Sequence, residues 1–225
     1  MIRSFLGLAA VLSLVTAGRS QDVKPLKVGD AMPGPFRMFV AYDGRFSTGP
    51  APQGDAAVPM KSAADDRKLH PNDRTDRMHC YICEAELNPT IAIFARTPAA
   101  ADAPAVKVAK AISPLVSDYK ANRLGSFVAF LTLGKEYQLE DGRDEKANTV
   151  RETAKQANAP NVPFGLAAGK SGQTDLHGLQ EGHDLTIILF DRMKVVQIWT
   201  FAADQPPDDA KIKELTAAIV NHVKK

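Results

Sequence analysis

Cysteine is scarce in this sequence, which has two among its 225 residues. Two cysteines form at most one internal disulfide, and this excludes the small scaffolds whose stability depends on several bridges. The stability of the fold must therefore come from an ordinary apolar core.

A surplus of one charge is also absent, because 28 Lys and Arg residues face 26 Asp and Glu residues and the net charge is +2. Acidic and basic residues are interspersed, so no basic stripe indicates a nucleic-acid partner. After the first residues, no apolar run approaches the roughly 20 residues of a membrane span. We therefore expect a soluble mature chain with no membrane span and no nucleic-acid partner.

Residues 1–21 have the three-part plan of a secretory signal peptide. Arg3 gives a basic start, residues 5–15 form an apolar run, and small residues follow. The run is too short for an ordinary membrane span, and a buried N-terminal helix is the alternative. The sequence predicts cleavage between Ala17 and Asp22. The product would be a secreted or periplasmic protein of about 200 residues, enough for one well-buried domain.

From residue 90 onward, the hydrophobic pattern alternates between strands and helices. Short apolar runs predict strands, and apolar residues three or four apart predict helices. The predicted strands are 90–95, 126–133, 185–190 and 195–201, and the predicted helices are 108–119, 144–157 and a last one that begins at Asp208 or Asp209. A helical connection between the first two strands makes them parallel, and a short turn makes the last two antiparallel. A mixed sheet with helices on both faces follows.

The part of the chain before residue 90 divides differently. Residues 22–44 form an N-terminal extension with a hairpin. Residues 45–89 lack apolar periodicity and are rich in Pro, Ala, Asp, Lys and Arg, which predicts a long irregular insertion. Loops of that length are uncommon in compact domains, so the insertion is either mobile or functional. Residues 90–225 form the core.

The order of these elements resembles the thioredoxin superfamily, and within it the branch of the peroxiredoxins and the membrane-tethered thiol–disulfide reductases. Those relatives open with a Gly-Asp-x-x-Pro-x-Phe type of segment and a small hairpin that ends in Asp-Gly, to which residues 28–44 are similar. Their apolar-Pro-apolar strand resembles residues 161–166 around Pro163. The resemblance implies an α/β fold, a thioredoxin-like mixed sheet flanked by helices.

The same resemblance implies a reactive cysteine just after the first core strand, at the start of the next helix. Residues 96–101 stand there and contain no cysteine, which excludes a thiolate mechanism at that place. The cis-proline that these relatives carry before the third core strand is also missing, because residues 181–184 have no proline. We interpret Pro163, about twenty residues earlier, as an ordinary trans proline at the start of a strand.

Cys80 and Cys83 instead form a Cys-x-x-Cys motif just before the first core strand. This position is at the opposite end of that strand from the usual site, unless the insertion folds back. As a structural disulfide, the pair closes so short a loop that the chain-entropy gain is only about 2 kcal/mol. As a redox pair, one thiol attacks a partner and its neighbour resolves the mixed disulfide, with His79 helping to lower a thiolate pKa. The long helix that normally follows such a motif is missing, because Pro89 comes soon after it.

A metal site is the third interpretation of the motif. Cys80, Cys83 and His79 make a soft ligand set that suits copper(I) or zinc. His177 and His183 stand in the loop before the third core strand and are either distant ligands or simply solvated. The expected site of copper or zinc would then be the cysteine pair itself.

Two functions therefore stay open. The first is an exported thiol–disulfide oxidoreductase that uses Cys80 and Cys83 as its catalytic residues and other exported proteins as its partners. The second is a non-catalytic thioredoxin-like binding module in which the pair is a structural disulfide or a copper or zinc site. No cofactor is predicted for the exchange reaction.

Overall fold

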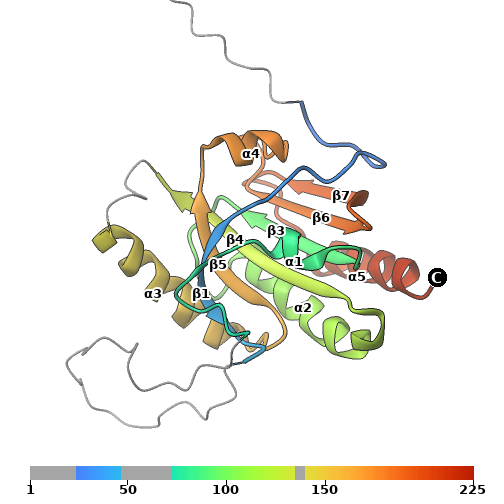
Figure 1. Cartoon of the computed structure of the whole chain (residues 1–225), viewed down its shortest axis with the longest axis horizontal. Coiled ribbons are helices and arrows are strands. Elements are labelled where there is room, and N and C mark those ends of the chain that lie inside the picture. Colours follow the sequence, from blue (N-terminus) through green and yellow to red (C-terminus); the bar gives the residue numbers. More distant parts are fainter. Residues whose placement is uncertain (1–23, 47–71, 135–139) are drawn as a thin grey trace, which may run out of the picture.

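The computed structural model describes residues 24–46, 72–134 and 140–225, so the expected signal peptide and most of the insertion lie outside the described residues (Figure 1). Within these ranges, seven strands form one mixed sheet in the order β2-β1-β5-β4-β3-β6-β7. The strands are β1 (Met38–Asp43), β2 (Met78–His79), β3 (Thr90–Ala95), β4 (Gly125–Leu133), β5 (Pro163–Ala168), β6 (Leu185–Asp191) and β7 (Lys194–Phe201).

The predicted core strands are confirmed. β3 pairs in parallel with β4 and antiparallel with β6, and β7 pairs antiparallel with β6. β3 is buried at every residue, as a strand between two others and beneath two layers must be. Pro163 begins β5, which pairs in parallel with β4, and the described residues contain no cis peptide bond, so Pro163 is trans as expected.

The N-terminal hairpin predicted within residues 22–44 does not form as expected, because its strand β1 pairs with strands from other parts of the chain. β1 pairs antiparallel with β5 on one side and with β2 on the other, with Met38 opposite His79. The second strand thus comes from beyond residue 44 rather than from residues 22–44. The physical reason is that β1 is apolar and almost wholly buried, so it is stable only with a neighbour at each edge. The prediction that residues 45–89 are irregular is therefore wrong for the end of this range, where β2 and a short helix form.

The helices are α1 (Tyr81–Ala85), α2 (Pro104–Asp118), α3 (Glu140–Ala157), α4 (Gly172–Leu176) and α5 (Asp209–Val223), with a 3₁₀ turn η1 (Lys120–Asn122). The predicted start of the last helix is confirmed, because the Asp208 carboxylate accepts the Lys211 N–H at 2.7 Å. No helix in the described ranges is long and apolar enough to cross a membrane.

The two faces of the sheet are covered differently (Figure 1). α2, α3 and α5 pack against one face and share one apolar cluster with it. The other face carries α1 and the N-terminal segment, which contribute Tyr81, Ile82, Met32 and Phe36 to a second cluster. This second face, free of long helices, is where the cysteine motif lies.

His177 belongs to this second face and is not a solvated loop residue. It is 1% exposed and lies against the rings of Phe36 and Phe94, with centroids 5.2 and 6.4 Å away. Its Nδ1 lies 2.7 Å from the Gln173 carbonyl oxygen. The expectation of a solvated histidine is wrong here because Ser171 caps α4, and α4 turns the following histidine inward. His183 is half-buried.

Stability should depend on pH through His177. Burial lowers the pKa of His177, and the carbonyls of Gln173 and Gly34 offset this only in part. In the unfolded chain the imidazole protonates near its ordinary pKa of about 6.5. Protonation of His177 is less favourable in the folded state than in the unfolded chain. The free energy of unfolding is therefore highest above pH about 6.5 and falls as the pH drops toward the lower pKa of the folded state.

Urea unfolding at several pH values measures this dependence. His177→Phe should flatten the loss of unfolding free energy below pH about 6.5. An unchanged pH slope in His177→Phe would contradict the assignment.

Candidate functional site

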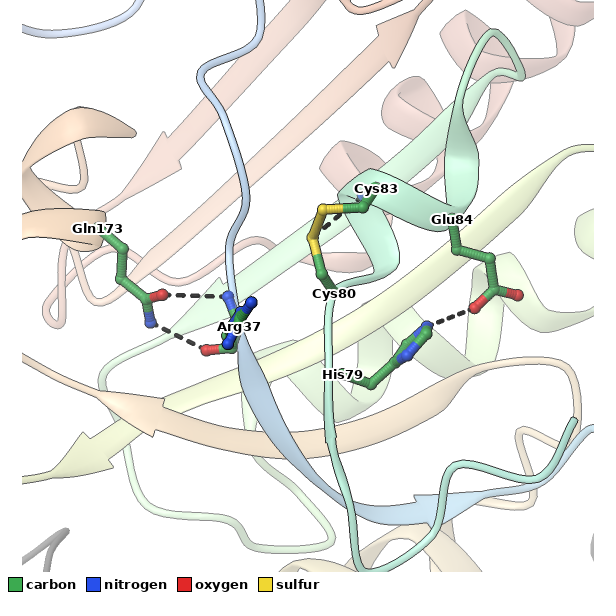
Figure 2. Close-up of a disulfide and its surroundings, with 6 residues drawn as sticks. All are labelled: Arg37, His79, Cys80, Cys83, Glu84 and Gln173. Carbon is green, nitrogen blue, oxygen red and sulfur yellow. Dashed lines mark hydrogen bonds and ion pairs between the residues drawn. A yellow bond between two sulfur atoms is a disulfide. The ribbon is translucent and has the colours of Figure 1, made fainter.

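Cys80 and Cys83 form a disulfide with their Cα atoms 5.3 Å apart (Figure 2). Cys80 is half-buried and Cys83 is exposed. The expectation that this pair forms a disulfide near the protein surface is confirmed. The exposed residue of the pair is the second one, Cys83, which the sequence pattern did not indicate.

A short helix frames the motif after all. Cys80 is the N-cap of α1, and its Sγ accepts the backbone N–H of Cys83 at 3.1 Å. α1 has five residues, which fit before Pro89. Tyr81, Ile82 and Ala85 are buried at spacings of one and four residues, as on one face of a helix. That spacing was the signal in the sequence that could have revealed the helix.

The last part of the insertion folds back along the sheet. The disulfide therefore does not lie at the start of β3, which is the end opposite the usual site. Met38 pairs with His79, and Phe39 pairs with Leu166 of β5. This register puts Cys80 level with Arg37, at the end of the sheet where β5 finishes. Gln173, just beyond β5, accepts the Arg37 N–H at 3.0 Å and donates to the Arg37 carbonyl at 2.9 Å (Figure 2).

An open groove of about 530 Å³ runs past the disulfide. Its lining contains one carboxylate, two guanidinium groups, one imidazole and three sulfur-bearing side chains. The residues are Arg37, Arg74, Met78, His79, Cys80, Cys83 and Glu84. Both cysteines line this groove, so a partner segment can reach them from solvent.

His79 is directed to Glu84 rather than to a sulfur. Its Nε2 lies 2.6 Å from Glu84 Oε2, and its ring packs edge-on against Tyr81 with centroids 4.7 Å apart. The hydrogen bond from His79 lowers the pKa of Glu84, and Arg45 adds to this effect while burial opposes it. In the part of the chain that the structure describes, no three His, Cys, Asp or Glu side chains are grouped as metal ligands.

A buried carboxylate ties α1 to the sheet. Asp43, the last residue of β1, has no exposed surface. Arg45 holds it in a bidentate pair, with Nε and Nη2 at 2.9 and 2.8 Å from the two oxygens. Tyr81 donates its hydroxyl to Asp43 Oδ2 at 3.1 Å, and Arg45 also reaches Glu84 at 3.2 Å. The first and fourth residues of α1 are thus linked to β1.

The protonation states in this network are fixed by burial and by charge. Burial, and next the negative charge of Asp43, raise the pKa of Tyr81, so the phenol keeps the proton that it donates. Burial disfavours the Arg45 cation, but hydrogen bonds and the charge of Asp43 outweigh it and raise the pKa of Arg45. The guanidinium also lies over the Tyr81 ring, 5.1 Å from its centroid.

The position at which relatives carry their reactive cysteine has a structural role in this chain. Arg96 follows β3 and donates to the carbonyl oxygens of Gly169, Leu179 and Gln180. These three carbonyls belong to the connections on either side of α4. The side chain therefore holds these loops together at the place where the sequence already excluded a thiolate mechanism.

Removal of the Asp43 carboxylate should release α1. Asp43→Ala leaves the Tyr81 hydroxyl without this acceptor and removes the buried, bidentate partner of Arg45, which should cost about 3–5 kcal/mol of unfolding free energy. Tyr81→Phe removes one hydrogen bond and should cost about 1 kcal/mol. Urea unfolding measures both.

The matched control is Glu152→Ala, which breaks an exposed ion pair with Lys155 on α3 and should cost about 0.5 kcal/mol or less. A loss in Asp43→Ala no larger than that of the control would contradict the anchoring role.

Comparisons of the whole chain agree with this architecture. No model of a known protein family matches the sequence, and no curated protein matches it. A Chlorobium tepidum structure described as a thiol:disulfide interchange protein DsbE is similar, with 15% identity over 88% of this chain and 99% of that chain and a TM-score of 0.50. AhpC of Mycobacterium tuberculosis has 12% identity over 87% and 99% of the two chains, with a TM-score of 0.52.

A hypothetical protein of Sinorhizobium meliloti, SMc02350, has 13% identity over 89% of this chain and 86% of its own, with a TM-score of 0.51. Likenesses at such low identity concern the fold alone. Together with the mixed sheet and its flanking helices, they show that this chain has a thioredoxin-like fold whose one cysteine pair, Cys80–Cys83, lies outside the usual position.

Proposed function

We propose that this protein is a thiol–disulfide exchange protein that acts through Cys80 and Cys83. The observation that carries the proposal is the asymmetry of the disulfide. Cys83 is exposed in an open groove, whereas Cys80 is half-buried and its Sγ accepts the Cys83 N–H. Cys83 is thus the more accessible cysteine for attack, and the hydrogen bond to Cys80 Sγ prepares Cys80 as the leaving thiolate.

The reaction begins with a partner thiolate that attacks Cys83 Sγ and forms a mixed disulfide. The Cys80–Cys83 bond breaks, and its electron pair goes to Cys80 Sγ. A thiolate leaves faster when the pKa of its thiol is lower. The hydrogen bond from the Cys83 N–H stabilises the Cys80 thiolate in this way. The second thiolate of the partner then attacks the partner's sulfur in the mixed disulfide and releases Cys83. The partner leaves as a disulfide, and the chain has gained two electrons.

A purely structural bridge is the competing function. Closure of so short a loop contributes only about 2 kcal/mol in the chain-entropy account. α1 is in addition held on the sheet by the buried side chains of Tyr81, Ile82 and Ala85 and by the hydrogen bond from Tyr81 to Asp43. The helix therefore has little need of the bridge, which favours exchange over structure.

The reduction of insulin disulfides by dithiothreitol tests the proposal. The oxidised protein should accelerate this reaction, and Cys80→Ser, Cys83→Ser and the double variant should not. At pH about 10, where both thiols are ionised, a small disulfide reagent should form the mixed disulfide faster with Cys80→Ser than with Cys83→Ser, because Cys83 is the exposed residue. No acceleration by the parent protein would leave the bridge a structural role, and faster labelling of Cys80 would reverse the assigned roles.

We also propose that residues 1–21 direct export, which would place the pair among other exported proteins as its partners. The basic start and short apolar run support this, and an oxidising compartment suits a resting disulfide. The mass of the protein recovered outside the cytoplasm should correspond to a chain that starts between residues 18 and 22. Intact protein retained in the cytoplasm would contradict export.

A further inference from the structure

A second cavity lies away from the sulfur atoms, at the end of the sheet where β3 and β4 begin. It has a volume of about 470 Å³ and is bounded by α1 on one side and by the end of α2 and η1 on the other. Its polar and charged lining includes Arg45, Glu84, Lys120, Arg123, Ser126 and Asn161. Nothing in the proposed exchange reaction uses this cavity.

The charges around the cavity favour an anion. Arg45 is matched by Asp43, and Glu84 is held by both Arg45 and His79. Lys120 and Arg123 are exposed, and neither forms an ion pair with another residue of the described ranges. Two cations therefore face the cavity without a carboxylate partner among these residues.

Ser126 supplies the second, independent observation. It is the second residue of β4 and is 6% exposed, yet its hydroxyl has no hydrogen-bond partner among the described residues. A buried hydroxyl normally has a partner, and one without a partner is unfavourable. Since Ser126 lines the cavity, a bound acceptor would satisfy its hydroxyl.

Apolar side chains form another part of the lining. Phe46, Tyr81, Val116 and Leu124 line the same space. Such a mixture of an apolar lining with a few polar groups is typical of sites for small organic molecules. The volume also exceeds what a bare inorganic anion would fill.

We propose that this cavity binds a small organic anion. The oxyanion head of the ligand accepts a hydrogen bond from the Ser126 hydroxyl and faces Lys120 and Arg123. Its apolar body lies against Tyr81 and Leu124. Carboxylate and phosphate heads share this chemistry. Because Tyr81 and Glu84 belong to α1, the ligand also touches the helix that carries the disulfide.

Calorimetric titration tests the site with benzoate and phenyl phosphate, which separate a carboxylate head from a phosphate head. Inorganic phosphate tests the head alone, and phenol tests the body alone. At least one of the two organic anions should bind saturably at one site and more tightly than either fragment. Ser126→Ala and the double variant Lys120→Ala/Arg123→Ala should each weaken that binding by about tenfold or more.

The matched control is Lys107→Ala/Lys110→Ala, which removes two exposed cations of α2 that do not line the cavity. It should bind as the parent does. Equal losses in the control and in Lys120→Ala/Arg123→Ala would show only a general effect of net charge and would overturn the site. Absence of saturable binding by both organic anions would overturn it as well.

The stability of the ligand-free protein shows whether the Ser126 hydroxyl already has a hydrogen-bond partner. Since the Ser126 hydroxyl has no protein partner, Ser126→Ala should unfold at the same or a higher urea concentration than the parent. A clear drop in the urea midpoint of Ser126→Ala would mean that the hydroxyl already has a partner in the free protein, and the proposal would fail.

Discussion

Asp43 is a carboxylate with no exposed surface, and such a group is stable only when other charges and donors surround it. In this protein the partners are Arg45, two residues further along the chain, and Tyr81, which comes from the last part of the insertion. The need to satisfy Asp43 thus joins the end of β1 to the first residue of α1. Because Cys80 immediately precedes that residue, the position of the disulfide depends on the same buried carboxylate.

The thioredoxin-like fold here keeps its sheet and changes the place of its sulfur atoms. Where relatives would carry a cysteine after β3, Arg96 holds three backbone carbonyls of the loops around α4. The cysteine pair instead lies on the face that has no long helix, at the start of the five-residue α1. Cys80 has the backbone donor that a thiolate needs, supplied by Cys83 itself. The exchange that we propose for the pair rests on this local geometry and not on the usual position in the fold.

The core could be predicted from the sequence because its strands are short apolar runs and its helices have clear apolar stripes. The strands at 90–95 and 185–190 and the cap at Asp208 are examples. The pairing of β1 with β2 could not be predicted, since it joins residues 38–39 to residues 78–79 near the end of the insertion and β2 has only two residues. The inward turn of His177 and the anchoring by Tyr81 likewise depend on contacts between distant segments, which periodicity does not report.

We propose that Cys80 readily becomes a thiolate once the disulfide opens, because the Cys83 N–H donates a hydrogen bond to its Sγ. The most direct measurement is the rate of alkylation of each cysteine in the reduced protein as a function of pH, followed by mass spectrometry. The hydrogen bond from the Cys83 N–H predicts an inflection for Cys80 below pH about 7.5. Inflections at pH about 8.5 or above for both cysteines, the value of an ordinary thiol, would contradict the claim.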